Sequence, residues 1–168
     1  NIVKWPDKVL ETKSAPVESF TEELQSIVKE MHSLMVKTRG IGLAANQIGL
    51  LKRVLTINIP YTQDDKLNKV CKRWWHDQVF TFVNPVLVTH SSQKTRAFEG
   101  CLSFPEVFDY VPRFSEVTVK AFNEFGKEFM VEADGLFAVC LQHEIDHLDG
   151  IIFVNRMSRL KSTMVTRK

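Results

Sequence analysis

The stretch CLQHEIDHLDG, residues 140–150, limits what this chain can fold into more than any other part of it. His143 and His147 are four residues apart, so on a helix both imidazoles lie on one face. Glu144 completes the pattern H-E-x-x-H, in which two histidines hold a metal ion and the glutamate handles a proton. Burying these polar side chains is costly unless they are paired or bind a metal. The stretch therefore predicts a buried helix that carries part of a metal site.

This helix supplies two metal ligands, and a third has to come from elsewhere. Asp149 follows His147 by two residues, so its side chain points to another side of the helix. Cys140 shares the face of the histidines but lies about 7 Å away along the axis. A cysteine side chain with its metal bond spans only about 5 Å, so Cys140 is expected to line the site as a small buried residue. Cys101, in EGCLSFP, is the principal candidate, and Cys71 is the alternative.

Two imidazoles and one thiolate leave a divalent metal with one open position for water, as in catalytic sites with three protein ligands. Glu144 is offset from the histidines, so it reaches that water and suits a general base and acid. Water attack on a carbonyl creates a negative oxygen that needs hydrogen-bond donors. The stretch GIGLAANQIG, residues 40–49, offers a tight backbone path and Gln47 as a donor. Its alternative interpretation is a helix end followed by a packed turn.

Two helices are expected from the spacing of apolar residues. Residues 21–39 carry them at three- and four-residue intervals, which predicts an amphipathic helix with Thr21 as N-cap and Gly40 as its C-terminal stop. The second helix, residues 134–150, carries the HEIDH motif, with Asp134 as N-cap and Gly150 as its end.

Strands are expected between the two helices. RVLTINI, residues 53–59, alternates as one strand, and residues 79–90 are expected to form two short strands broken at Asn84 and Pro85. Residues 117–133 predict a hairpin around the turn NEFG. EGCLSFP is strand-like, and Gly100 within it lets another backbone or a ligand come close. The fold class is therefore α+β, with mainly antiparallel sheets packed around the central helix that carries the HEIDH motif and with an N-terminal amphipathic helix.

Length and composition suit one soluble globular domain over residues 1–168, which the motifs make a catalytic one. A net charge of +2 argues against nucleic-acid binding by the chain as a whole. No apolar run approaches the length of a membrane span, and the opening residues show no signal-peptide pattern. Three cysteines, an odd number, favour a reducing compartment over a disulfide framework.

Two segments allow more than one interpretation. Residues 60–78 are polar and without periodicity, and they form either an insertion packed by Trp74 and Trp75 or a surface for a partner. Cys71 and His76 in this insertion have no further ligand beside them, which argues against a second metal site. The tail is either a solvated helix or a surface for an anionic partner, because it carries no acid after Asp149. Its basic residues are Arg156, Arg159, Lys161, Arg167 and Lys168.

Taken together, three stretches resemble the motifs of the peptide deformylase family. GIGLAANQ, EGCLSFP and QHEIDH match a G-x-G-x-A-A-x-Q loop, an E-G-C-L-S strand and a Q-H-E-x-D-H helix of that family, in the same order. The opening PDKVLETKSAPVESF is similar as well, so the resemblance covers nearly the whole chain. Three matched motifs in order are highly specific.

The resemblance implies a reaction and a set of roles. The metal ligands would be Cys101, His143 and His147, which hold one divalent ion, ferrous iron in the cell and often zinc or nickel in preparations. Glu144 would be the general base and acid, and Gln47 and the backbone N–H of Leu102 would stabilise the oxyanion. The reaction would remove the N-formyl group from the initiator methionine of a nascent polypeptide and release formate.

The resemblance also implies how partners bind. The peptide would lie as an added strand between residues 40–42 and Gly100, with the methionine side chain in a pocket. The residues implied in substrate binding are Gly40, Ile41, Gly42, Glu99, Gly100, Leu136, Val139 and Cys140, and Gln142 would support the site. The basic tail matches a C-terminal helix that docks on the ribosome in some bacteria. The expected location is the bacterial cytoplasm, with an organelle as the alternative, and neither a membrane nor specific DNA is an expected partner.

The chain departs from the family pattern in three places. The insertion at residues 60–78 is longer than in many members, Phe108 stands near a position where many bacterial members carry arginine, and Asn46 replaces a commoner proline or threonine. Two other functions are considered. A metalloprotease that cuts internal peptide bonds would need a third ligand downstream, which this chain lacks. A non-catalytic metal-binding relative would need neither Glu144 nor Gln47.

Overall fold

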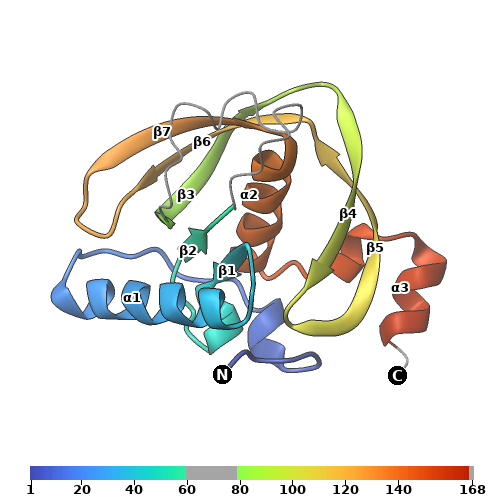
Figure 1. The fold of residues 1–168 in the computed structure, drawn as a ribbon, viewed down its shortest axis with the longest axis horizontal. Helices are drawn as coiled ribbons and strands as arrows, with labels where there is room; N and C mark the ends of the chain where they lie inside the picture. The colour runs from blue at the N-terminus through green and yellow to red at the C-terminus, as the bar shows by residue number, and fades with distance from the viewer. Residues whose placement is uncertain (60–78, 167–168) are drawn as a thin grey trace.

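The computed structural model describes residues 1–59 and 79–166, and these residues form two antiparallel sheets around one central helix (Figure 1). The expected α+β class is therefore confirmed. The expectations about Cys71, His76, Trp74 and Trp75 and about the last two residues, 167–168, lie outside the described residues. Within the described part of the chain, no helix is both long and apolar enough to cross a membrane.

The larger sheet has five strands in the order β1-β2-β3-β6-β7, and every neighbouring pair is antiparallel. Its strands are β1 (Gly42–Ala44), β2 (Val54–Ile57), β3 (Phe80–His90), β6 (Glu116–Phe122) and β7 (Glu128–Asp134). The predicted hairpin is confirmed, with Val119 opposite Val131 in β6 and β7. Because β1 is the last strand of the sheet, its outer edge has no strand partner among the described residues.

The expected break at Asn84 and Pro85 is wrong, because β3 continues through both residues. Pairing with β6 shifts between Val83 and Val86, which is where a β-bulge absorbs the extra residue. Asn84 adopts a positive φ of 51°. Its side-chain amide also accepts from the backbone N of Val17 and donates to the backbone O of Val17, both at 2.8 Å. These two bonds hold the bulge, so the strand does not end there.

The smaller sheet is a hairpin of β4 (Lys94–Cys101) and β5 (Phe104–Phe114). Sequence analysis recognised only its tip, because the polar and proline residues of the arms hide the alternation. One face of these strands is buried and the other is exposed. The buried face carries Glu99 and Arg113, and the exposed face carries Phe98 and Tyr110. The hairpin therefore has an inner face toward the core and an outer face in solvent.

Helix α2 (Gly135–Leu148) lies between the five-stranded sheet and the β4–β5 hairpin (Figure 1). Each residue from Phe137 to Leu148 is buried, so the HEIDH motif lies in the interior of the molecule. Asp134 is the N-cap as predicted, although its side chain makes no capping hydrogen bond within the described structure. Gly150 follows the helix end with a φ of 73°, and a Cβ there would lie 2.7 Å from the backbone O of Glu11. Only glycine allows this close approach.

Helix α1 (Glu22–Lys37) lies at the lower left of the molecule in Figure 1 and packs its apolar stripe against β1 and β2. Thr21 is its N-cap, and its side-chain oxygen accepts from the backbone N of Leu24. Gly40 was the expected stop, but the left-handed residue is Arg39, with a φ of 54°. The short helices are η1 (Lys8–Glu11), η2 (Ala45–Ile48), η4 (Phe153–Arg156) and α3 (Arg159–Thr166), and α3 buries none of its described residues.

Candidate active site and metal centre

Cys101, at the end of β4, lies beside the two histidines of α2. The possible ligand atoms of Cys101, His143 and His147 are all within 4.8 Å of one another. The Sγ of Cys101 is 3.2 Å from the Nε2 of His147. The other upstream candidate, Cys71, is outside the described residues, and Cys140 does not belong to the group. The fold therefore brings the three expected ligands together across 46 residues of sequence.

Glu99 sets the orientation of His143. Its Oε2 lies 2.7 Å from the Nδ1 of His143, which leaves the Nε2 of that ring for a metal. Glu99 also accepts two hydrogen bonds from the guanidinium of Arg113, at 2.7 and 3.0 Å. Glu99 was expected in the substrate pocket, and it does line the cavity. Its carboxylate is nevertheless fully engaged with Arg113 and His143.

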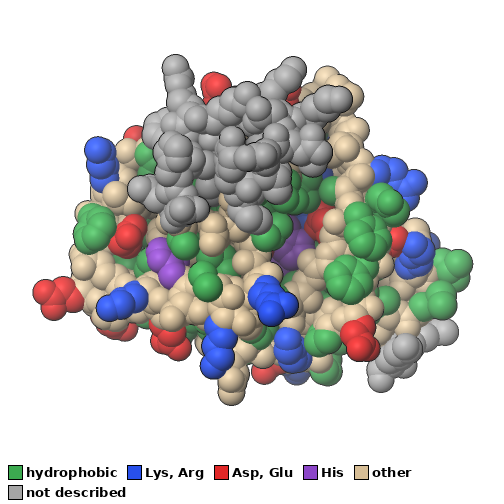
Figure 2. All heavy atoms as spheres, in the orientation of Figure 1, with side chains coloured by type: hydrophobic (Ala, Val, Ile, Leu, Met, Phe, Trp, Pro, Cys, Tyr) green, Lys and Arg blue, Asp and Glu red, His purple; other side chains and the backbone are tan. Residues whose placement is uncertain are grey.

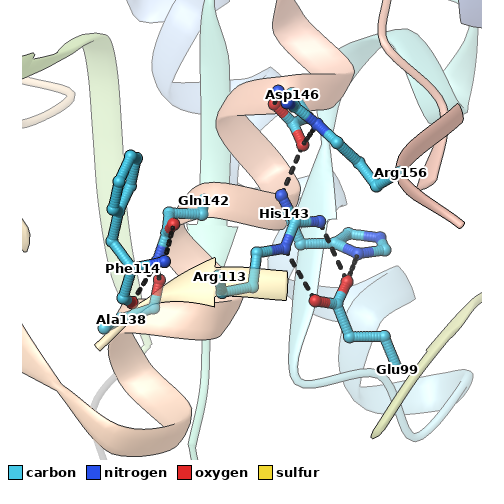
Figure 3. A network of polar contacts seen from close by, with 8 residues as sticks. All are labelled: Glu99, Arg113, Phe114, Ala138, Gln142, His143, Asp146 and Arg156. Atoms are coloured by element: carbon cyan, nitrogen blue, oxygen red, sulfur yellow. Dashed lines mark hydrogen bonds and ion pairs between the residues drawn. The ribbon is translucent and has the colours of Figure 1, made fainter. Parts of the chain in front are cut away.

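Arg113 extends this network one turn further along α2, to Asp146 (Figure 3). It donates to Asp146 at 2.5 Å, and Asp146 in turn accepts two hydrogen bonds from Arg156, at 2.6 and 3.1 Å. Gln142 binds the same hairpin, because its side-chain amide pairs with both the N and the O of Phe114 at 2.9 Å. The network therefore fixes α2, and the histidines on it, relative to β4 and β5.

The charges around His143 favour a cation at the centre of the site. Burial opposes the charged form of His143, but neighbouring Cys101, Glu99 and Glu144 outweigh burial and raise its pKa well above the usual value. Burial lowers the pKa of His147 well below its usual value, with His143 adding to the effect. Burial also disfavours ionisation of Glu99, yet Arg113 and His143 hold its pKa below the usual value. The groups around His143 therefore favour a positive charge at its ring.

Glu144 faces the loop at residues 40–42. A Cβ on Gly42 would lie 2.4 Å from the Oε1 of Glu144 and 2.8 Å from the Sγ of Cys140, so glycine is required for this approach. Burial raises the pKa of Glu144 to about 7. Its Oε2, like the Nδ1 of His147, is buried without a hydrogen-bond partner among the described side chains and backbone. Such an atom marks a place where water or a ligand binds.

Gln47 is held in one orientation by the backbone and by Ser103. Its Oε1 accepts from the backbone N of Ala44 at 2.9 Å, so its Nε2 has to point the other way. That Nε2 lies 3.1 Å from the Oγ of Ser103 and 3.6 Å from the Sγ of Cys101. The side-chain amide therefore offers a donor beside Cys101. Leu102 follows in the turn between β4 and β5, and its carbonyl accepts from Lys4.

A cavity of about 470 Å³ joins these groups, and Figure 2 shows it as a hollow in the surface. The expected site residues that line it are Gly40, Ile41, Gly42, Gln47, Glu99, Gly100, Cys101, Leu102, Leu136, Val139, Cys140, His143 and Glu144. His147 is not among them. It lies behind Cys101 and is 1% exposed.

Sequence reasoning missed several residues that position the site. Arg113 and Asp146 were not singled out, although Asp146 follows His143 by three residues and so shares its side of the helix. Asn46 was noted only as a departure from the family pattern, but its Nδ2 donates to the backbone O of His147 at 2.6 Å. Gly100 was expected to admit a backbone or a ligand. Instead, the ring of Phe108 covers it, with a Cβ at 100 only 2.4 Å from that ring.

The donor set suits a divalent metal. Two imidazoles and a thiolate converge on one point, the neighbours of His143 favour a positive charge there, and an unpaired carboxylate oxygen stands beside them. A three-ligand centre that opens to a cavity and has a buried carboxylate of pKa about 7 is typical of a metal-dependent hydrolase.

Comparison with known proteins identifies the family. Residues 1–163 match the family described as Polypeptide deformylase. The peptide deformylase of Neisseria gonorrhoeae is 42% identical over 168 residues, which are 100% of this chain and 92% of that protein. The peptide deformylase of Chromobacterium violaceum is 39% identical with the same coverage.

Solved structures agree with the sequence matches. The crystal structure of peptide deformylase from Ehrlichia chaffeensis superposes with a TM-score of 0.90 at 36% identity, covering 99% of this chain and 92% of that one. A second structure of the Ehrlichia enzyme, in complex with actinonin, gives a TM-score of 0.87 at 35% identity over the same shares of the two chains. The peptide deformylase of Legionella pneumophila gives 0.86 at 41% identity, covering 100% and 91%. The chain therefore belongs to the polypeptide deformylase family.

Proposed function

We propose that this chain removes the N-formyl group from the N-terminal formylmethionine of newly synthesised polypeptides and releases formate. The observation that carries the proposal is the convergence of Cys101, His143 and His147 within 4.8 Å, beside Glu144, in a chain of the polypeptide deformylase family. Because nascent chains are the substrate, the enzyme works in the compartment where translation takes place. We infer that this is the bacterial cytoplasm, since the curated relatives reported above are bacterial.

Cys101, His143 and His147 would hold one divalent metal, with ferrous iron proposed for the cell and zinc or nickel for preparations. When bound, the metal supplies the Lewis acidity that activates water and polarises the formyl carbonyl. Glu99 keeps the Nε2 of His143 directed at the metal, because it holds the Nδ1 at 2.7 Å.

Glu144 carries the proton of the reaction. Its carboxylate takes a proton from the attacking water as the new C–O bond forms, and it gives that proton to the methionine nitrogen as the C–N bond breaks. A pKa of about 7, raised by burial, suits both transfers near neutral pH. The Nε2 of Gln47 and the backbone N–H of Leu102 donate to the oxygen that becomes negative in between.

The substrate binds as an extra strand between two strand edges. Consecutive residues 40–42 and 98–102 line the cavity, which indicates that the edge of β4 and the backbone that leads into β1 face it. An extended peptide fills such a slot by hydrogen bonding to both backbones. The methionine side chain enters the apolar end of the cavity, formed by Ile41, Leu136, Val139 and Cys140.

The reaction class is tested with two substrates. We expect formate release from formyl-Met-Ala-Ser, measured by a coupled formate assay. We expect no cleavage of the internal bonds of a peptide whose amino terminus is blocked, measured by mass spectrometry. We also expect inhibition by actinonin, which binds the Ehrlichia enzyme. Internal cleavage without formate release would instead identify a metalloprotease.

The role of Glu144 is tested by Glu144→Ala. We expect kcat/KM for formate release to fall at least about 1,000-fold, because the proton acceptor is lost. The metal content, measured by elemental mass spectrometry, should remain near one ion per chain. The matched control Glu30→Gln changes an exposed acid on α1 and should leave both values unchanged. Full activity in Glu144→Ala would contradict this mechanism.

We also propose that helix α3 docks on the ribosome. The helix carries Arg159 and exposes two apolar side chains, Leu160 at 74% and Met164 at 64%. A basic helix with an exposed apolar stripe suits the anionic and protein surfaces of a ribosome. Truncation after Arg156 should abolish co-sedimentation with ribosomes, and retention of co-sedimentation would refute the docking proposal alone.

A further inference from the structure

Three aromatic side chains form a cluster on the outer face of the β4–β5 hairpin. We call Phe98, Phe108 and Tyr110 the aromatic cluster. They are 64%, 61% and 52% exposed. The ring centroids of Phe98 and Phe108 are 5.9 Å apart, and those of Phe98 and Tyr110 are 5.2 Å apart. Such a contiguous exposed apolar patch marks a binding surface more often than a single exposed side chain does.

The aromatic cluster is continuous with the active-site cavity. Phe98 and Phe108 both line it, and Figure 2 shows hydrophobic side chains over β4 and β5 at its edge. Phe108 pairs with Gly100 across the hairpin, one residue from Cys101. The missing side chain at Gly100 leaves the space that the ring of Phe108 occupies. The cluster therefore begins at the backbone of β4 next to the metal centre.

The alternation of side chains in β4 decides which substrate residue meets the cluster. Glu99 points inward, where it bonds to His143 of α2, so Phe98 on the neighbouring position points outward. A peptide strand added at the edge of β4 shares these two faces. When its methionine side chain points inward toward α2, its second side chain points outward on the face of the aromatic cluster. Laterally adjacent side chains in a sheet lie about 5 Å apart and touch.

We propose that the aromatic cluster binds the side chain of the second residue of the substrate and gives the enzyme a preference for large apolar or aromatic residues there. This inference rests on the proposed deformylase function and on the added-strand position of the peptide. The occupant fits the surface, because the exposed rings of Phe98 and Phe108 bind an apolar side chain better than a hydroxyl. Phe98 and Phe108 are thus specificity-determining residues.

The test compares formyl-Met-Phe-Ser with formyl-Met-Ser-Ser, which differ only in the second residue. We expect kcat/KM of the wild type to be about tenfold higher for the phenylalanine peptide. Phe98→Ala and Phe108→Ala should each lower this ratio toward one. The matched control Phe125→Ala removes an aromatic ring that is 67% exposed in the turn between β6 and β7 and should keep the wild-type ratio. A ratio is insensitive to partial unfolding, which lowers both rates equally.

The outcomes separate this inference from the proposed function. Formate release with equal kcat/KM for both peptides would overturn the inference and leave the function standing. No formate release from either peptide, with metal bound, would overturn the function itself. A second copy of the chain is the alternative occupant of the patch. A dimer in light scattering that Phe98→Ala dissociates would therefore also overturn the inference.

Discussion

Gly42 and Glu144 meet where β1 passes closest to α2. The glycine belongs to the loop motif and the glutamate to the helix motif, and 102 positions separate them in the sequence. A Cβ at 42 would lie 2.4 Å from the Oε1 of Glu144. The loop motif therefore needs glycine there because the proposed general base occupies the space of a side chain.

Gly42→Ala should displace Glu144 and lower kcat/KM for formate release about 100-fold, measured by steady-state kinetics. Gly49→Ala is the matched control, since a Cβ there would have no heavy atom within 4 Å in the described structure. Its φ of 85° strains alanine, so the control should lose about 1 kcal/mol of stability and keep its activity. Equal activity in both variants would contradict the proposed contact.

Glu99→Gln removes the charge that orients His143. We expect metal affinity to fall about 10- to 100-fold, because the second partner of a ligating histidine fixes its ring and raises its basicity. Competition with a chelator of known affinity measures the effect. Glu132→Gln, on the exposed side of β7, is the control. An unchanged affinity would mean that Arg113, and not His143, is the functional partner of Glu99.

Helix α2 is mainly apolar, but its Asp146 belongs to a row of ion pairs with Arg113 and Arg156. Asp146 and Arg113 are 11% and 3% exposed, and their ion pair joins the helix to β5. Arg156 of η4 pairs with Asp146 from the solvent side, and its side chain is 43% exposed. Buried charges of this kind are costly when one partner is removed, whereas an exposed partner is screened by water.

Asp146→Asn should lower the free energy of unfolding by about 3 kcal/mol, because it leaves Arg113 short of an acid in the interior. Arg156→Ala should lower it by less than about 1 kcal/mol, since water replaces the exposed guanidinium. Urea unfolding followed by circular dichroism compares the two variants with the wild type. Equal losses in the two variants would show that Asp146 contributes to stability through Arg156 and not through Arg113.

The candidate metal centre joins the β4–β5 hairpin to helix α2, because β4 supplies Cys101 and α2 supplies the histidines. A ligand that binds only the folded state raises its stability. A free metal concentration of about 100 times the dissociation constant adds about 2.7 kcal/mol to the free energy of unfolding. The unfolding temperature of a domain of this size then rises by about 5–10 °C.

Calorimetry with and without a chelator measures this shift. Cys101→Ser should abolish most of it, because the thiolate is lost. Cys140→Ser should keep it, because that cysteine is not part of the ligand group. A shift that depends on Cys140 instead would contradict the ligand assignment.

Much of the fold and two of the three candidate metal ligands followed from local patterns. The i, i+4 spacing of His143 and His147 put both imidazoles on one helix face, and strict alternation predicted β6 and β7. Patterns that depend on distant partners were missed. Asn84 continues β3 because Val17 binds its side chain, and the arms of the β4–β5 hairpin were not recognised.

The sequence by itself determined that His143 and His147 share one helix face with Glu144 beside them. It also determined that Cys140 is too far along the helix axis to be a ligand of the same metal, because helical geometry is set by covalent spacing. Only the tertiary structure placed Cys101 beside His147, Glu99 between His143 and Arg113, and Phe98 on the outer edge of the cavity. These positions depend on how strands and helix pack across tens of residues. No local period encodes that packing.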